Sequence, residues 1–192
     1  AALRTTTGSI GYVGPLLNDE IRRLVNSVYL GAEYCWENYR GNDAADLTFA
    51  VNWIGFWFNI PGVTLDPTLV SKSFIDGGAD VLISGIDTTE ALTVAGQEAA
   101  DGATVAAIPY DYVGACDSAP EVCLGTPWFN WGPAYLEIAQ SVIDGTFTAG
   151  FQWNGPDWAD INNPDTTAIG YIQGPGLTAD EATTIQQFID GL

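Results

Sequence analysis

Short apolar runs alternate with amphipathic stretches along most of the chain. Four runs have the length of buried strands, and they lie at 9–13, 47–53, 80–84 and 103–108. Four other stretches repeat apolar residues at helical spacing or carry helix start and stop signals, and they lie at 18–36, 66–77, 87–100 and 133–143. Strands that alternate with such helices indicate right-handed βαβ units. The pattern therefore predicts an α/β fold, with a Rossmann-like parallel sheet and helices on both faces.

The pattern changes after Gly145. The remaining segment contains Trp153 and Trp158 among Gly-Pro and Asn-Pro breaks, then a strand at 167–172 and a capped helix that starts at Thr178. We therefore expect two parts. Residues 1–150 form a Rossmann-like ligand-binding lobe, and residues 151–192 form a tail that crosses back or wraps.

The composition is that of a globular chain with a strongly acidic surface. Hydrophobic residues make up 47% of the 192 positions, which is enough to bury a core, and no apolar run reaches the roughly 18 residues of a membrane span. Asp and Glu total 24 against 5 Lys and Arg, so the formal net charge is −19. This balance argues against binding to nucleic acid or anionic lipid, which depends on Lys and Arg. It suits a secreted or salt-exposed protein, or simply a very soluble surface.

The cysteines and the amino terminus bear on the compartment. Cys116 and Cys123 flank a short loop that one disulfide could close, which would indicate an oxidising environment. Cys35 lies on the apolar stripe of a predicted helix, and we expect it to be buried rather than reactive. The chain begins at Ala1 and contains no Met, so we expect that its start reflects processing or the choice of a fragment.

Candidate binding residues follow the predicted strands, because ligands of open parallel sheets bind outside the carboxyl ends of the strands. Aromatic rings and isolated polar groups gather there, and the candidates are Asn18, Trp57, Gly85, Asp87 and Asp111. A ring with a few polar anchors suits a flat or sugar-like small ligand that is neutral or cationic. The residues indicate no metal site and no cofactor.

Each candidate also has a plain structural interpretation. Phe56, Trp57 and Phe58 cannot all face one way, and we favour Trp57 as the exposed ring. Asp87 opens a D-T-T-E sequence, so it is the expected cap of the following helix, and a cap can also contact a ligand. Asp111 could be an ordinary loop acid.

The aromatic segment Trp128, Phe129 and Trp131 is open to two interpretations as well. We expect these rings to pack beneath the loop, unless one of them lines a cleft.

The sequence argues against catalysis. It contains no His, which excludes Ser-His-Asp and Cys-His nucleophile systems and zinc sites of the Cys/His type. No phosphate-binding Gly-rich motif follows a strand. Asp87 and Asp111 could form a carboxylate pair of the glycosidase kind, but two acids at one sheet edge are a weak signal. We therefore expect a binding protein.

Four segments in order resemble the second lobe of the BMP family, the basic-membrane-protein or PnrA-like lipoproteins that serve ABC importers. They are I-G-Y-V-G-P-L-L-N-D-E at 10–20, W-I-G-F-W-F-N at 53–59, F-I-D-G-G-A-D-V-L at 74–82, and W-F-N-W-G-P-A-Y at 128–135 followed by I-D-G-T-F at 143–147. The likeness extends over about residues 8–150. Some nucleoside-binding members have a lysine in the element that includes Phe129, and this chain has none there.

The resemblance implies one lobe of a type I periplasmic-binding-protein fold, which closes with a second lobe on a ligand that is often a purine nucleoside. By position, Trp57 matches the aromatic that stacks on the base, Asp87 falls in a ligand-contacting loop, and Asp111 matches the acid that holds the ribose hydroxyls. Phe129 belongs to a further ligand-side element. The tail would then pack on an amino-terminal lobe that this chain lacks.

We therefore expect an extracytoplasmic solute-binding protein, at the cell surface or in the periplasm, with a permease as partner and a lipid anchor in the full-length protein. The alternative is a structural or self-assembling extracellular module built from the same lobe, which would associate through the face left open by the missing lobe.

Overall fold

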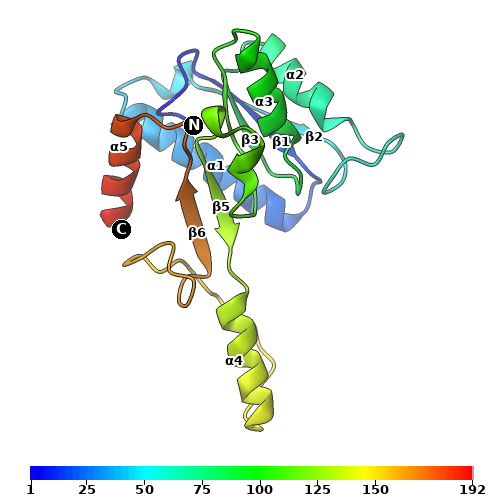
Figure 1. The fold of residues 1–192 in the computed structure, drawn as a ribbon, viewed down its shortest axis with the longest axis vertical. Coiled ribbons are helices and arrows are strands. Elements are labelled where there is room, and N and C mark those ends of the chain that lie inside the picture. Colours follow the sequence, from blue (N-terminus) through cyan, green and yellow to red (C-terminus); the bar gives the residue numbers. More distant parts are fainter. Residues whose placement is uncertain (192) are drawn as a thin grey trace.

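The computed structural model describes residues 1–191, which form a body and a projecting arm (Figure 1). Four parallel strands form the central sheet of the body in the order β2-β1-β3-β4. They are β1 (Ser9–Gly14), β2 (Thr48–Trp53), β3 (Val81–Ser84) and β4 (Ala106–Ile108). Ile10 lies opposite both Phe49 and Val81, so β1 is central. The α/β class and the parallel sheet predicted from the alternating pattern are confirmed.

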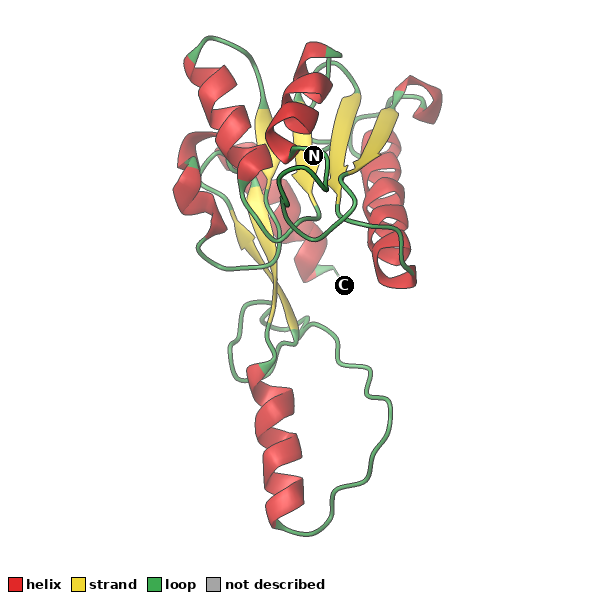
Figure 2. Cartoon of the chain, turned by 90° about the vertical axis from the view of Figure 1, so that its right-hand side faces the viewer, coloured by secondary structure: helices red, strands yellow, loops and turns green. Residues whose placement is uncertain are grey.

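Helices cover both faces of this sheet (Figure 2). They are α1 (Asp19–Asn38) on one face, and α2 (Pro67–Asp76) and α3 (Glu90–Ala100) on the other. Tyr12 packs with Ile21 and other α1 residues, whereas its neighbour Val13 packs with Phe74 and Leu92 from α2 and α3. Successive strand residues thus enter opposite halves of the core, as the period of a strand buried on both faces requires.

A two-stranded antiparallel ribbon leads out of the body and back. Its strands are β5 (Gly125–Phe129) and β6 (Ile169–Gln173). Between them lie α4 (Gly132–Ile143) and a long connection, and we call residues 130–168 the arm (Figures 1 and 2). No residue of α4 is buried. The chain ends in α5 (Ala179–Asp190), which lies at the side of the body (Figure 1).

The ribbon and the arm depart from the pattern read along the sequence. The sequence analysis predicts no strand at β5, where Pro127 interrupts the apolar run, and a two-stranded ribbon tolerates proline because it has open edges. The expected boundary at residue 150 falls inside the arm, because α4 already lies outside the body. Whether the tail packs on a second lobe stays a prediction.

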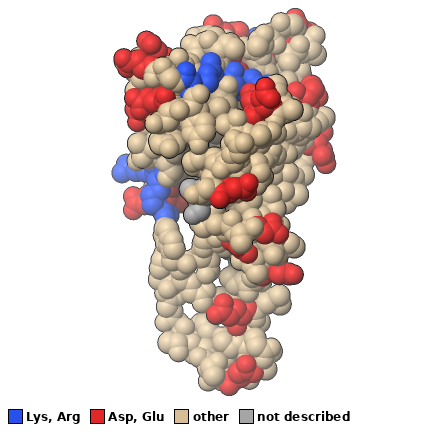
Figure 3. Space-filling view, turned by 90° about the vertical axis from the view of Figure 1, so that its left-hand side faces the viewer, with Lys and Arg blue, Asp and Glu red and all other residues tan. Residues whose placement is uncertain are grey.

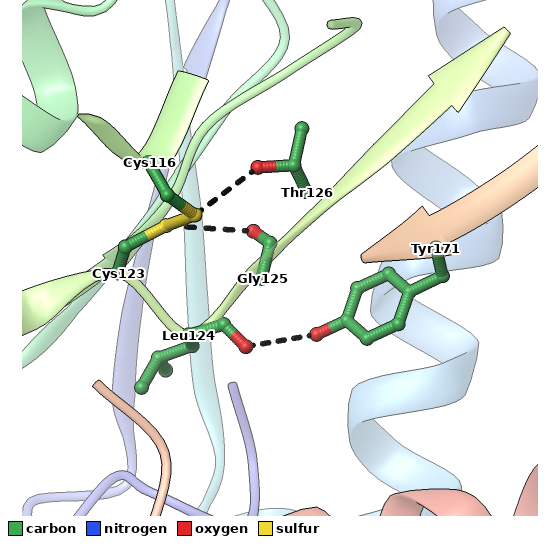
Figure 4. The surroundings of a disulfide bond; sticks show 6 residues. All are labelled: Cys116, Cys123, Leu124, Gly125, Thr126 and Tyr171. Carbon is green, nitrogen blue, oxygen red and sulfur yellow. Dashed lines mark hydrogen bonds between the residues drawn. A yellow bond between two sulfur atoms is a disulfide. The ribbon is translucent and has the colours of Figure 1, made fainter. Parts of the chain in front are cut away.

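Three short 3-10 helices complete the structure: Ala44–Asp46, Ala115–Ser118 and Pro120–Val122. The last two lie in the loop between β4 and β5, where a disulfide joins Cys116 to Cys123 (Figure 4). Their Cα atoms are 5.5 Å apart. The loop therefore closes on itself directly before β5 begins.

Charge and hydropathy are unevenly distributed over the surface. On the face shown in Figure 3, the Lys and Arg side chains lie on the body. The charged side chains visible at the lower end, which is the arm, are Asp and Glu. α1 has 20 residues, but neither it nor any other described helix has an apolar stretch that could cross a bilayer.

Candidate functional site

The loops that follow the strands place Trp57, Asp87 and Asp111 at the edge of the sheet where the parallel strands end. They come after β2, β3 and β4 respectively. The backbone N–H of Asp87 donates to the carbonyl oxygen of Trp57 at 2.9 Å, which joins two of these loops. The backbone N–H of Asp111 donates to the carbonyl oxygen of Pro127 at 3.1 Å, which ties the third loop to β5. We call this region the carboxyl edge.

Trp57 is half-buried and packs against the core cluster that contains Tyr12. Phe56 and Phe58 are the exposed rings, and they contact each other edge-on with centroids 5.0 Å apart. The prediction that Trp57 is the exposed ring of the three is therefore wrong. Trp57 turns toward the body because burial of the largest ring removes the most apolar area from water.

Asp87 does not cap the helix that follows it. α3 begins at Glu90 with Thr89 at the N-cap position, so the capping interpretation of the D-T-T-E sequence is wrong. The loop after β3 is longer than the spacing suggests, and it carries Asp87 to an exposed position. No hydrogen bond within the described residues contributes to the pKa of this carboxyl group. The carboxylate is therefore available to a ligand.

Asp111 has a backbone conformation that is rare for residues other than glycine. Its φ is +83°, the one positive value among the described non-glycine residues. Aspartate tolerates this region better than most residues do. Its side chain is half-buried at the start of the loop that leads to the disulfide. This backbone conformation determines the direction in which the side chain leaves the main chain.

The acids at the carboxyl edge influence one another. Although Asp87 is exposed at the surface, partial desolvation by the surrounding loops raises its pKa, and the charges of Asp111 and Glu20 raise it further. Burial also raises the pKa of Asp111. Among the described residues, no Lys or Arg contributes to either shift. The edge is therefore an acidic surface that favours hydrogen-bond donors or cations and disfavours anions.

Glu20 is a member of this group that the sequence analysis used only as a helix-start signal. It lies in the first turn of α1, and α1 follows β1. The start of any helix that follows a strand lies at the carboxyl edge, and this placement is the signal that could have identified it. These acids form no group that could hold a metal ion within the described part of the chain.

Asn18 and Gly85 have structural roles at this edge. The Oδ1 atom of Asn18 accepts a hydrogen bond from the backbone N–H of Ile21 at 2.8 Å and caps α1, as predicted. Gly85 is buried, and the hydroxyl group of Tyr12 occupies the place where a Cβ atom would stand. Glycine is therefore required there by close packing. A direct contact of either residue with a ligand stays a prediction.

A row of aromatic rings leads from the carboxyl edge into the arm. Tyr110 contacts Phe129 edge-on with centroids 6.0 Å apart, and Trp131 follows Phe129 at 5.9 Å. Trp131 stacks on Tyr135 of α4 at 6.2 Å with 20° between the planes. Phe129 is half-buried, but Trp131 is 61% exposed. The expectation that these rings pack beneath the loop is therefore wrong for Trp131.

Two hollows of the structure lie away from the carboxyl edge. The structure has an apolar cavity between α1 and α5 and a small polar pocket between α2 and α3, and neither includes Trp57, Asp87 or Asp111 among its described lining residues. These two hollows therefore lie apart from the three residues.

No protein-family model matches the chain. A purine-binding protein of Brucella abortus (strain 2308) is 29% identical over 155 residues, which cover 81% of this chain and 39% of that protein. A solute-binding protein of an ABC transporter system from Aeropyrum pernix K1 superposes with a TM-score of 0.66 at 14% identity, over 94% of this chain and 43% of that one.

A protein described by a different function has a similar fold. A transcriptional activator of the comK gene from Bacillus halodurans superposes with a TM-score of 0.64 at 15% identity, over 98% of this chain and 57% of that one. The chain thus spans about two fifths of the curated relative and about half of each solved structure. The structural likenesses show that the chain has the fold of a solute-binding protein lobe.

Proposed function

We propose that the chain is the C-terminal lobe of an extracytoplasmic solute-binding protein, which holds a small neutral ligand such as a nucleoside and delivers it to the permease of an ABC importer. The observation that carries the proposal is that Trp57, Asp87 and Asp111 lie at the edge from which the arm also projects. The relatives described as purine-binding and solute-binding support this role.

The arm supports a second lobe opposite the carboxyl edge. β5 starts beside β4 in parallel, with the backbone N–H of Leu124 donating to the carbonyl oxygen of Ala107 at 2.9 Å, and it continues past the end of the sheet. Large apolar side chains of the arm are exposed to solvent: Ile143 is 77% exposed and Phe151 is 87% exposed. A domain that covered them would also face the carboxyl edge. The ligand would then be enclosed between two lobes.

The chemistry of the edge suits a nucleoside. Carboxylates accept hydrogen bonds from ribose hydroxyl groups, and Asp87 and Asp111 are free to do so. The partly exposed ring of Trp57 would stack on the base. The acidic surface would disfavour nucleotides, whose phosphates carry negative charge. The proposed role includes binding and release, and no step that makes or breaks a covalent bond.

The proposed location is outside the cytoplasm, with the full-length protein anchored by lipid at the cell surface or in the periplasm. The disulfide between Cys116 and Cys123 supports this location, because such bonds persist in oxidising compartments. The acidic surface, with a net charge of −19, suits exposure to salt.

Isothermal titration calorimetry on the full two-lobed protein tests the proposal. Adenosine, guanosine and uridine should bind, and AMP should bind more weakly. Asp111→Asn should weaken nucleoside binding by about tenfold or more, because it removes a charged hydrogen-bond acceptor. Asp101→Asn, at the opposite end of α3, is the matched control and should leave affinity unchanged. If none of these compounds, adenine or ribose binds, the transport role is wrong.

A self-assembling extracellular module is the second candidate, and the exposed apolar side chains of the arm favour it. Its partner would be another copy of the chain, packed on the arm. Light scattering coupled to size-exclusion chromatography at several concentrations distinguishes the two. A monomer at all concentrations argues against assembly, and a stable oligomer that binds no solute argues for it.

A further inference from the structure

A second space of ligand size lies away from the carboxyl edge, between α1, the sheet and α5. It has a volume of about 800 Å³. Ile83, Ile108 and Leu124 form its floor, Ala32 and Cys35 form one wall, and Ile185 of α5 faces them. Binding pockets for small molecules span about 300 to 1,000 Å³. This cavity is therefore large enough for an organic ligand.

The first turn of α5 is fastened to the start of the chain. Arg4 donates from Nε to Oε1 of Glu181 at 2.7 Å and from Nη2 to Oε2 at 2.5 Å. The same Nη2 group donates to the carbonyl oxygen of Gly176 at 2.7 Å, directly before the helix. Glu181 also completes the capping box with Thr178. This end of α5 is held in place by charged hydrogen bonds.

The last turns of α5 are fastened by aromatic contacts. The ring of Phe188 lies 6.4 Å from Tyr34 and 6.3 Å from Tyr39, both on the α1 side, measured between centroids. Ile189 is the single buried residue of the helix. Both ends of α5 are therefore attached to the body, and the cavity lies between the middle of α5 and α1.

The lining determines which ligand the cavity could hold. Arg4 and Glu181 are the charged side chains among the described lining residues, and each is paired with the other. Tyr171 donates its hydroxyl hydrogen to the carbonyl oxygen of Leu124 at 3.1 Å (Figure 4). The remaining side chains of the floor and walls are apolar or nearly so. The α-amino group of Ala1 also lines the cavity, but burial lowers its pKa from 8.0 to about 6, so it is mostly uncharged at neutral pH. A charged ligand would therefore find no unpaired charge of opposite sign there.

Protein interiors are packed with few voids larger than a water molecule, and apolar cavities bind apolar molecules rather than water. We propose that the cavity between α1 and α5 is a second binding site, for an uncharged apolar molecule of the long-chain alcohol type. It goes beyond the proposed solute-binding role, since the lining residues that the structure describes do not belong to the carboxyl edge.

Adjacent threonines on α5 provide a matched pair of variants. Thr184 lines the cavity, whereas Thr183 is exposed. Each donates its hydroxyl hydrogen to a carbonyl oxygen four residues earlier at 2.8 Å. Thr184→Phe therefore places a ring inside the cavity and takes up part of its space, and Thr183→Phe makes the same change on the surface. Circular dichroism checks that both variants fold, and Thr184→Leu is a smaller replacement if Thr184→Phe does not.

The probe is N-phenyl-1-naphthylamine, an uncharged apolar fluorophore, titrated into the purified protein, with 1-dodecanol as competitor. We expect saturable fluorescence that dodecanol displaces and a dissociation constant at least tenfold higher in Thr184→Phe, with no change in Thr183→Phe. Cys35, a free cysteine on the cavity wall, gives an independent readout. Saturating dodecanol should slow its reaction with 4,4′-dithiodipyridine several-fold.

Two results would overturn the proposal. One is probe fluorescence that is non-saturable or equal in the two phenylalanine variants, since the probe would then bind elsewhere. The other is a reaction rate of Cys35 that dodecanol does not change, since dodecanol would then not occupy the space beside this residue. Nucleoside titrations repeated with dodecanol present keep the two sites distinct, because failure of one leaves the other measurable.

Discussion

The backbone N–H of Asp87 donates to the carbonyl oxygen of Trp57 at 2.9 Å, and this bond joins the loops that follow β2 and β3. The two residues are thus positioned through their main chains. Within residues 1–191, no hydrogen bond affects the pKa of the Asp87 carboxylate, and part of the Trp57 ring remains exposed. Both groups can therefore contact a ligand without first breaking a contact within the protein.

Asp87→Asn should stabilise the ligand-free protein at neutral pH. Because the folded state raises the pKa of Asp87, its ionised form opposes folding above the shifted pKa. The gain should be complete above the folded pKa and should vanish below the unfolded value of 3.8, where both states are protonated. Thermal unfolding across pH measures it. Asp101→Asn, at the opposite end of α3, is the control for removal of an acid outside the carboxyl edge. A lower Tm for Asp87→Asn would contradict the argument from desolvation and repulsion.

Replacement of Asp111 should separate the role of its carboxyl group from that of its backbone. Gly and Ala both remove the acid, but only Gly adopts φ near +83° without steric cost. Asp111→Gly should therefore be about 1 kcal/mol more stable than Asp111→Ala. Urea denaturation measures the difference. Equal stabilities would mean that the loop relaxes to a negative φ in the Ala variant.

Loss of the Arg4–Glu181 pair should loosen α5. Glu181→Gln should lower the free energy of unfolding by about 2 kcal/mol, because it weakens charge-assisted hydrogen bonds between partly buried groups. The hydrogen bond from Arg4 lowers the pKa of Glu181 from 4.5 to about 2. The stabilisation is therefore complete above pH 4.5 and is lost as the pH falls toward 2. Asp180→Asn, in the same turn, should change stability by only a few tenths of a kcal/mol.

Asp80 should be among the most sensitive acids of the chain. Its carboxylate accepts hydrogen bonds from the hydroxyl group of Thr5, from the backbone N–H of Thr6 at 2.6 Å and from that of Thr7 at 3.1 Å. Burial alone would raise the pKa of Asp80, but these hydrogen bonds outweigh it and lower the pKa. Asp80→Ala should cost about 3 kcal/mol in urea denaturation, since several donors lose their acceptor.

The contribution of Asp80 should disappear in acid. It is present above the unfolded pKa of 3.8 and is lost as the pH falls through the lower folded value. Asp76→Ala is the control, because that acid is 62% exposed and should cost less than 1 kcal/mol. Equal losses for the two variants would show that the Thr5–Thr7 segment does not depend on Asp80.

Salt should stabilise the protein. With a net charge of −19 and no Lys or Arg after residue 72, the compact state carries strong self-repulsion that added ions screen. The Tm should rise steadily as KCl increases from low to molar concentration. A neutral osmolyte at matched osmolality is the control. It is excluded from the protein surface as some salts are, but it does not screen charges, so it should raise the Tm less than KCl does. A Tm independent of salt below about 0.5 M would contradict electrostatic repulsion as the cause.

Elements with regular apolar periods could be predicted from the sequence because the period reports which face is buried. The helix expected at 18–36 is found at Asp19–Asn38, and the strand expected at 80–84 at Val81–Ser84. The short spacing of Cys116 and Cys123 indicated a loop that one disulfide could close, and the structure contains that disulfide. Local patterns sufficed for these features.

The candidate site could be predicted only in part. That Trp57, Asp87 and Asp111 end up at one edge follows from parallel topology, because the carboxyl ends of parallel strands lie together. Their environments do not follow from it. Trp57 is half-buried where exposure was expected, and Thr89 takes the capping position expected for Asp87. Loop conformation depends on contacts with distant residues, which spacing along the chain does not encode.

The sequence by itself determined the alternation of strands and helices, the parallel sheet and the acidic surface, because hydrophobic period and charge are local properties. Only the tertiary structure decided that residues 130–168 leave the body, that Glu20 joins the acids of the carboxyl edge, and that a cavity separates α1 from α5. Each of these depends on which surfaces meet in space, and the free energy of that packing comes from residues far apart in the chain.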